Sequence, residues 1–147
     1  RNLVVSTRKA STKQVFSDAE REAMQDAKVE RRKSKKADGE ADLLAKVAEM
    51  NESDRAIAER LHALVKENAP SLAPKTWYGM PAWANPAGKV VCFMTPAGKF
   101  DSRYASFGFN DSAMLDDGTV WPTSFAVTRL TTADEDMFAR LLKKAVA

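Results

Sequence analysis

The 147-residue sequence contains only one cysteine, Cys92, and one histidine, His62. A single cysteine excludes a disulfide within the chain, and the two residues together cannot supply the four ligands of the usual structural zinc sites. No apolar run approaches the ~18 residues that a membrane-spanning helix needs, and the first residues lack the pattern of a signal peptide. We therefore expect a cytoplasmic domain without a membrane partner.

The sequence motifs of common enzymes are missing as well. There is no phosphate-binding glycine loop, no dinucleotide fingerprint and no GxSxG elbow, and the six glycines are spread as turn residues. Any nucleophile–base pair would have to use His62 or Cys92. We expect His62 at the surface or at the boundary of the core, because it lies roughly 115° from the centre of the apolar stripe of its helix. We expect Cys92, inside an apolar strand, to be a buried inert thiol. These expectations favour a non-enzymatic function with no catalytic residues.

Charge and aromatic residues are distributed unevenly along the chain. The formal net charge is +3; residues 1–50 hold 12 Lys and Arg against 9 Asp and Glu, whereas residues 51–147 hold 11 of each. Among the seven Phe, three Trp and two Tyr, only Phe16 precedes Trp77. We predict a basic, Ser/Thr-rich tail and charged helical extension over residues 1–40, and an α+β domain over residues 41–147.

Three segments have the patterns of helices. Ser17 and Glu20 have the spacing of a capping box, and Gly39 is a plausible end of the first helix, with a short helical piece following over residues 41–50. Residues 51–70 form the strongest helix, which ends at a proline. Its apolar stripe consists of Ile57, Leu61, Leu64 and Val65. Thr132 and Glu135 form a second capping box that begins a closing helix.

The region between these helices has the composition of strands and turns. We predict strands over residues 75–78, 89–95, 103–109 and 125–130, with Gly79 and Pro81 forming a turn and residues 110–124 a polar loop. Helices followed by strands and a final helix indicate an α+β fold. We expect a mainly antiparallel sheet of about four strands, flanked by N-terminal helices and a C-terminal helix.

Carboxylates and basic residues offer two kinds of candidate site. Hard cations prefer carboxylate oxygens, and the candidate metal ligands are Asp116, Asp117, Asp134, Glu135 and Asp136. The same residues also suit a turn and the acidic first turn of a helix. The candidate contacts to nucleic-acid phosphates are Arg31, Arg32, Lys33, Lys35 and Lys36, which would equally suit a solvated helix end. Base stacking on Trp77, Trp83 or Trp121 would need these rings exposed beside positive charge.

The stretch "ENAPSLAPKTWYGMPAWANPAGKVVCFMTPAGKFDSRYASFGF" over residues 67–109 resembles the YdhG-like domain family. The segment "YGMPAW" is the most specific part, and the resemblance covers about Asn51 to Ala147. It implies a small bacterial α+β domain of unknown function with a curved antiparallel sheet. One member is described as a frataxin-like iron chaperone, so the resemblance also implies iron as a possible ligand.

The density of aromatic residues around residues 75–84 gives the leading functional hypothesis. We expect a binding domain for a small molecule or a peptide, with a site on an aromatic face rimmed by the 110–122 loop. The candidate ligand-binding residues are Tyr78, Met80, Trp83, Tyr104 and Trp121. A structural alternative is that these side chains plug one end of the sheet. The functional alternatives are iron handling and association with nucleic acid or a ribonucleoprotein through the basic extension.

Overall fold

The computed structural model describes residues 17–147, apart from the side chains of residues 22 and 25–35. The chain divides into two units, Arg1–Lys35 and Lys36–Ala147, whereas the sequence suggested a boundary at residue 40. In the first unit, Ser17 Oγ accepts a hydrogen bond from the backbone N–H of Glu20 at 3.2 Å, at the predicted helix start. The following description concerns the second unit.

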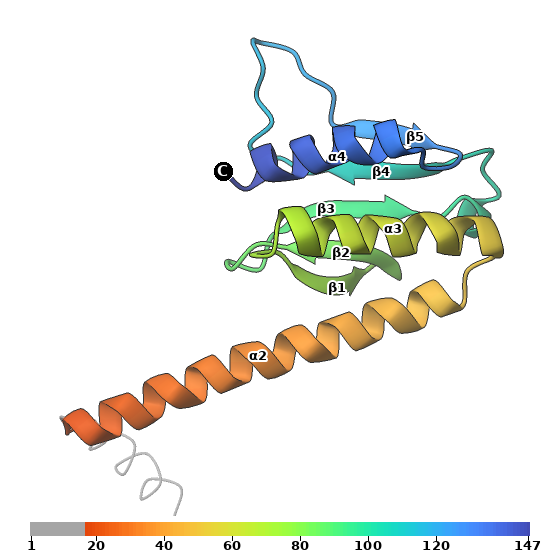
Figure 1. Ribbon diagram of the computed structural model, residues 1–147. Coiled ribbons are helices and arrows are strands. Elements are labelled where there is room, and N and C mark those ends of the chain that lie inside the picture. Colours follow the sequence, from red (N-terminus) through yellow and green to blue (C-terminus); the bar gives the residue numbers. More distant parts are fainter. Residues whose placement is uncertain (1–16) are drawn as a thin grey trace, which may run out of the picture. The chain divides into compact units, whose positions relative to one another are not determined.

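The second unit is an α+β fold, as the sequence predicts, built on a five-stranded antiparallel sheet in the order β1-β2-β3-β4-β5 (Figure 1). The helices are α2 (Asp18–Ala48), of which the residues from Lys36 belong to this unit, α3 (Glu52–Asn68), the 3-10 turn η1 (Gly98–Phe100) and α4 (Thr132–Ala145). The strands are β1 (Ala73–Trp77), β2 (Met80–Ala84), β3 (Val90–Thr95), β4 (Ala105–Phe109) and β5 (Ser124–Val127). The sheet therefore has five strands where four were expected.

The additional strand is β2, which includes Pro81, where a turn formed by Gly79 and Pro81 was predicted. The turn itself consists of Tyr78 and Gly79, both with positive φ (51° and 73°), and Trp77 pairs with Met80 across it. In such a two-residue hairpin the closing pair exchanges hydrogen bonds, so the next pair, Thr76 and Pro81, does not. Pro81 thus costs no hydrogen bond to β1, and the pairing of β2 with β3 begins only at Ala82.

The predicted helix end at Gly39 is also wrong, because α2 continues through it to Ala48. A Cβ at this position would lie 2.2 Å from the carbonyl oxygen of Pro74 in β1. The glycine therefore permits close contact between the helix backbone and the edge strand, instead of ending the helix.

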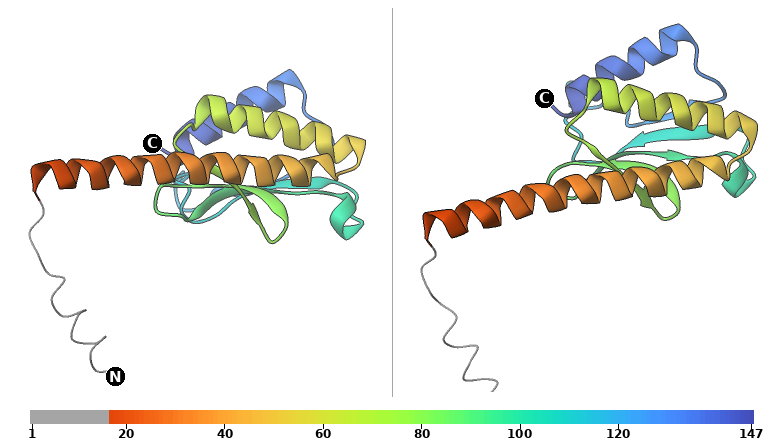
Figure 2. Two further views of the ribbon diagram at one scale, coloured as in Figure 1. Left: turned by 90° about the horizontal axis from the view of Figure 1, so that it is seen from below. Right: turned by 60° about the horizontal axis from the view of Figure 1, so that its bottom comes forward.

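The core lies between one face of the sheet and the helices. In Figure 1, α3 lies in front of β2 and β3 and α4 lies in front of β4 and β5, and Figure 2 shows both helices on the same side of the sheet. The predicted apolar stripe of α3 is buried in this core together with Leu43 and Val47 of α2. Phe107 of β4 packs edge-to-face on Phe138 of α4, with ring centroids 5.1 Å apart.

Two further helix starts are defined by capping side chains. Asn51 caps α3 by accepting a hydrogen bond from the N–H of Asp54. The capping box of α4 consists of Thr131 and Asp134, one residue before the predicted pair of Thr132 and Glu135. No helix over residues 17–147 is long and apolar enough to cross a membrane.

Candidate ligand-binding face

The sheet face opposite α3 and α4, which we call the outer face, is not covered by any α-helix of Lys36–Ala147 (Figure 2). The strand register places small side chains at most of its positions: Ala82 and Ala84 in β2, Ser106 and Gly108 in β4, and Ser124 and Ala126 in β5. Two large aromatic residues, Trp77 and Phe93, stand on the same face and are only partly buried. The outer face therefore carries mostly small side chains, with two large rings among them.

These rings form a continuous group with the residue of the first turn. The ring centroids of Tyr78 and Trp77 lie 5.0 Å apart, and those of Trp77 and Phe93 lie 5.1 Å apart, both pairs in edge-to-face geometry. The Phe93 ring lies against Gly108, where a Cβ would be 2.8 Å from its tip. Tyr78 is 79% exposed. We call Trp77, Tyr78 and Phe93 the outer aromatic row.

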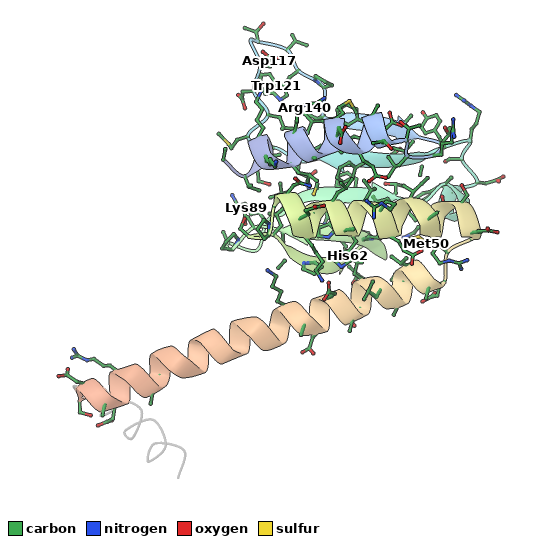
Figure 3. The ribbon with its side chains drawn as sticks, in the orientation of Figure 1. Met50, His62, Lys89, Asp117, Trp121 and Arg140 are labelled. Atoms are coloured by element: carbon green, nitrogen blue, oxygen red, sulfur yellow. The ribbon has the colours of Figure 1, made fainter. Side chains whose placement is uncertain are left out.

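Beside Trp77, the outer face opens into a hollow of about 500 Å³. It is lined by Lys75, Trp77, Gly88, Lys89, Val90, Asn110, Asp111 and Ser112. The Asn110 amide and the Ser112 hydroxyl both donate to the carbonyl oxygen of Val90, at 3.1 and 3.0 Å. These bonds fix the wall of the hollow. Lys75 and Lys89 bring two positive charges to it, against the single negative charge of Asp111 (Lys89 is labelled in Figure 3).

The other end of the outer face carries a second group of exposed rings, in the connection between β3 and β4. Phe100 is 61% exposed and Tyr104 is 38% exposed. The Lys99 Nζ lies 5.7 Å from the Phe100 ring centroid, and the Arg103 guanidinium lies 5.2 Å from that of Tyr104. Each exposed ring is thus paired with a cation. We call residues 99–104 the basic–aromatic segment.

Two contacts hold the basic–aromatic segment in place. Lys99 Nζ donates to the carbonyl oxygen of Tyr78, which joins the segment to the turn of the outer aromatic row. Asp54, which is 3% exposed at the start of α3, accepts hydrogen bonds from the backbone N–H groups of Ala97 (3.0 Å) and Gly98 (2.9 Å). A buried carboxylate therefore anchors the beginning of the segment to the core.

The five predicted ligand-binding residues do not form one cluster. Tyr78 and Met80 belong to the β1–β2 hairpin. Met80 is buried, and its sulfur accepts a hydrogen bond from the Thr95 hydroxyl. Tyr104 belongs to the basic–aromatic segment. Trp83 is fully buried on the opposite face, and Trp121, on the loop between β4 and β5, packs partly buried against the core (Figure 3).

The expectation of a surface or boundary position for His62 is wrong, since it is 7% exposed. Its Nδ1 accepts a hydrogen bond from the Trp83 indole N–H at 3.2 Å, and its Nε2 lies 2.7 Å from Glu40 Oε2. Residues of α2 after Lys36, including Glu40, lie beside this side of α3 (Figure 3). Lys66 Nζ lies 2.9 Å from the same carboxylate oxygen. The hydrogen bond from Lys66, followed by that from His62, lowers the pKa of Glu40.

Both ring nitrogens of His62 are therefore occupied. The Cys92 thiol is buried, as predicted, and burial raises its pKa. Neither side chain is placed to act as a nucleophile or a base toward a bound molecule.

The predicted metal ligands lie on two features: Asp134, Glu135 and Asp136 at the start of α4, and Asp116 and Asp117 on the loop between β4 and β5. Asp134 caps α4, where hydrogen bonds from Thr131 lower its pKa. Glu135 forms an ion pair with Arg60 of α3, while Asp116 and Asp117 are exposed on the loop between β4 and β5 (Asp117 is labelled in Figure 3). Over the part of the chain that the structure describes, no three His, Cys, Asp or Glu side chains come close enough to hold a metal ion.

The predicted nucleic-acid contacts of the extension lie mostly outside the described residues. The side chains of Arg31, Arg32, Lys33 and Lys35 are among those not described. Lys36 is described, and its Nζ donates to the carbonyl oxygen of Pro70 at 2.9 Å.

Most residues of the outer face were not predicted as ligand-binding residues from the sequence. Trp77 and Phe93 were not among its ligand-binding residues, and neither were Phe100 and the cations of the basic–aromatic segment. A signal was available: the segment "KFDSRY" contains two pairs in which a cation is followed directly by an aromatic residue. Phe93 also alternates in its strand with Cys92 and Met94, which predicts that it faces away from them.

Comparisons with known proteins add no assignment. No family model, no curated protein and no solved structure matches the chain. The resemblance to the YdhG-like family stays a prediction from the sequence.

Proposed function

We propose that this chain is a binding domain and that its ligand lies on the outer face of the sheet, across the outer aromatic row. The observation that carries the proposal is the ring contact of Trp77, Tyr78 and Phe93 on a face that no α-helix of Lys36–Ala147 covers. Exposed apolar surface bordered by polar groups is typical of interaction sites. On the inner face of the sheet, by contrast, the large rings are buried beneath helices, as is usual in an α+β domain.

Binding is better supported than catalysis by the state of the reactive side chains. His62 uses both ring nitrogens within the core, and the Cys92 thiol is buried with a raised pKa. An outer face of rings, lysines and small side chains offers contacts to a ligand but no group with evident catalytic reactivity.

The hollow beside Trp77 indicates the chemistry of the ligand group. It is open to solvent, so a ligand group in it would keep one side exposed. An aromatic ring of the ligand could pack against Trp77 while a negative group pairs with Lys75 or Lys89. The hollow therefore suits a ligand that carries a flat ring beside a negative charge.

The test is a titration of the full chain, labelled with ¹⁵N, with indole-3-acetate, 2-naphthoate and the peptide Asp-Trp-Asp. We expect backbone amide shifts concentrated in residues 75–78 and 89–93. Trp77→Leu should weaken the binding, because it keeps an apolar side chain but removes the ring. Val120→Ala is the matched control, because Val120 is 85% exposed on the loop between β4 and β5. Shifts confined to α3 and α4, or no shift with any probe, would contradict the proposal.

A further inference from the structure

We infer that the outer face binds single-stranded nucleic acid, with the outer aromatic row and the basic–aromatic segment acting as one surface. The inference rests on the proposed binding function and names its ligand class. It uses rings and cations on the sheet itself and assigns no contact to the extension before Lys36.

The exposed rings of the described residues are concentrated on this surface. The aromatic side chains that are more than a third exposed, among those the structure describes, are Tyr78, Phe100 and Tyr104. All three lie on the β1–β2 turn or the basic–aromatic segment, and Lys99 links these two connections through the Tyr78 carbonyl. Stacking of bases on exposed rings is the main sequence-tolerant contact in single-strand binding. The exposed rings therefore form a local stacking platform.

Cations lie beside the rings of this surface, where they could pair with the phosphates of a nucleotide chain. Lys99 lies over Phe100 and Arg103 over Tyr104, while Lys75 and Lys89 line the hollow beyond Trp77. Residues 99–104 and the lining of the hollow hold four basic residues and two acidic ones, Asp101 and Asp111. Glu49 and Asp54 add two carboxylates in the pocket that Lys99 and Gly79 also line. Each base stacked on a ring would bring its phosphate near one of these cations.

Other polyanions fit this surface less well. A DNA duplex keeps its bases stacked within the helix, so its bases could not reach separate rings on a flat sheet. An acidic peptide could pair with the lysines, but most of its side chains have no flat face to stack on three exposed rings. A single strand supplies both a ring and a phosphate at every residue.

The test measures fluorescence anisotropy of a labelled dT20 strand with the full chain at several salt concentrations. Tyr78→Ala and Phe100→Ala should each weaken binding by about tenfold, the size expected for loss of one base stack. Both side chains are largely exposed, so their removal leaves the fold intact. The Lys75→Gln/Lys89→Gln double variant should reduce the slope of log affinity against log salt by about one or more. Met114→Ala, at another exposed apolar position, is the control and should leave binding unchanged.

Three outcomes would overturn the inference. The first is binding that survives both ring substitutions but is lost in the Arg31→Gln/Arg32→Gln/Lys33→Gln/Lys35→Gln variant, which would assign it to the extension. The second is equal affinity for dT20, for a 20-base-pair duplex and for heparin, which would show attraction by charge alone. The third is affinity for poly-glutamate but none for dT20.

The inference and the proposed function can fail separately. If the aromatic acids shift the amides of residues 75–78 but dT20 does not bind, the outer face is a binding site for another ligand. If neither binds, both proposals fail.

Discussion

The two faces of the sheet are made from the same five strands but differ in what lies on them. The inner face presents Trp83, Phe107 and Met94, all fully buried under α3 and α4. The outer face presents alanine, serine and glycine at most positions, with Trp77 and Phe93 between them. Alternate residues of one strand thus serve separate tasks, folding on one side and, as we propose, binding on the other.

The difference is clearest in the two tryptophans of the first hairpin. Trp83 is enclosed, and its indole N–H donates to His62 Nδ1 within the core. Trp77 is partly exposed and contacts only the neighbouring rings Tyr78 and Phe93 among aromatic side chains of the described residues. One tryptophan of the hairpin is therefore part of the core, and the other is part of the surface.

The largest expected effect separates these two tryptophans. Trp83→Ala should lower the free energy of unfolding by about 3–5 kcal/mol, because it empties a large buried volume. Trp77→Ala should lower it by about 1–2 kcal/mol, since only part of its surface is buried. Guanidinium unfolding monitored by circular dichroism measures both. Equal losses would remove the distinction between the faces.

A second prediction concerns the closure of the inner face at its β1 edge. Gly39→Ala should destabilise the protein by at least about 2 kcal/mol, because the new Cβ would meet the Pro74 carbonyl. Helix propensity alone predicts the opposite sign, a gain of about 1 kcal/mol. The reverse substitution Ala45→Gly, at an exposed position of the same helix, should cost about 1 kcal/mol. A gain in thermal stability for Gly39→Ala would mean that the helix does not contact β1 in this way.

A third prediction tests how the core holds the basic–aromatic segment. Asp54→Ala should cost about 1–3 kcal/mol, because the N–H groups of Ala97 and Gly98 lose their acceptor. Hydrogen exchange should become faster at these two amides and through residues 99–104. The exposed Asp42→Ala, on α2, is the control and should change stability by less than about 0.5 kcal/mol. Unchanged exchange in Asp54→Ala would show that the segment is held by other contacts.

The smallest effect is a dependence of stability on pH that arises from Glu40, on the inner side of the sheet. The pKa of Glu40 is lowered in the folded state, first by Lys66 and then by His62. Its contribution to stability is therefore complete above the ordinary glutamate pKa of 4.5 and is lost as the pH falls through the lowered value. Since Glu40 is 30% exposed, the contribution should be below about 1 kcal/mol.

Comparing the wild type with Glu40→Gln isolates this contribution. The variant should be less stable at pH 7, and the difference should shrink as the pH falls from 5 to 3. The exposed Glu59→Gln is the control and should show no such convergence. A difference that grows on acidification would contradict a lowered pKa of Glu40 in the folded state.

The sequence was a good guide where a local pattern decides the structure. The apolar stripe of α3 and the strand β3 follow from spacing and from β-branched and apolar composition, and both are present. The capping pair of α4 was misplaced by one residue, because "TT" offers two adjacent hydroxyls of equal quality. Local patterns thus predict an element better than they predict its first residue.

The sequence was a poor guide where the answer depends on a distant partner. The role of Gly39 is set by the carbonyl of Pro74, and the burial of His62 by Glu40 and Trp83. The predicted binding cluster joined Met80 and Trp83, which face opposite sides of β2. Because a proline argues against a strand, β2 was not predicted. The alternation of side chains that separates Met80 from Trp83 therefore could not be used.

The most direct test of the division between the faces uses the three tryptophan indole N–H signals in a ¹⁵N spectrum of the full chain. On addition of dT20, we expect the Trp77 signal to shift progressively while the Trp83 signal, held by His62 inside the core, stays in place. Movement of Trp83 with no change at Trp77, or no movement of either while dT20 binds, would contradict an outer face that binds and an inner face that folds.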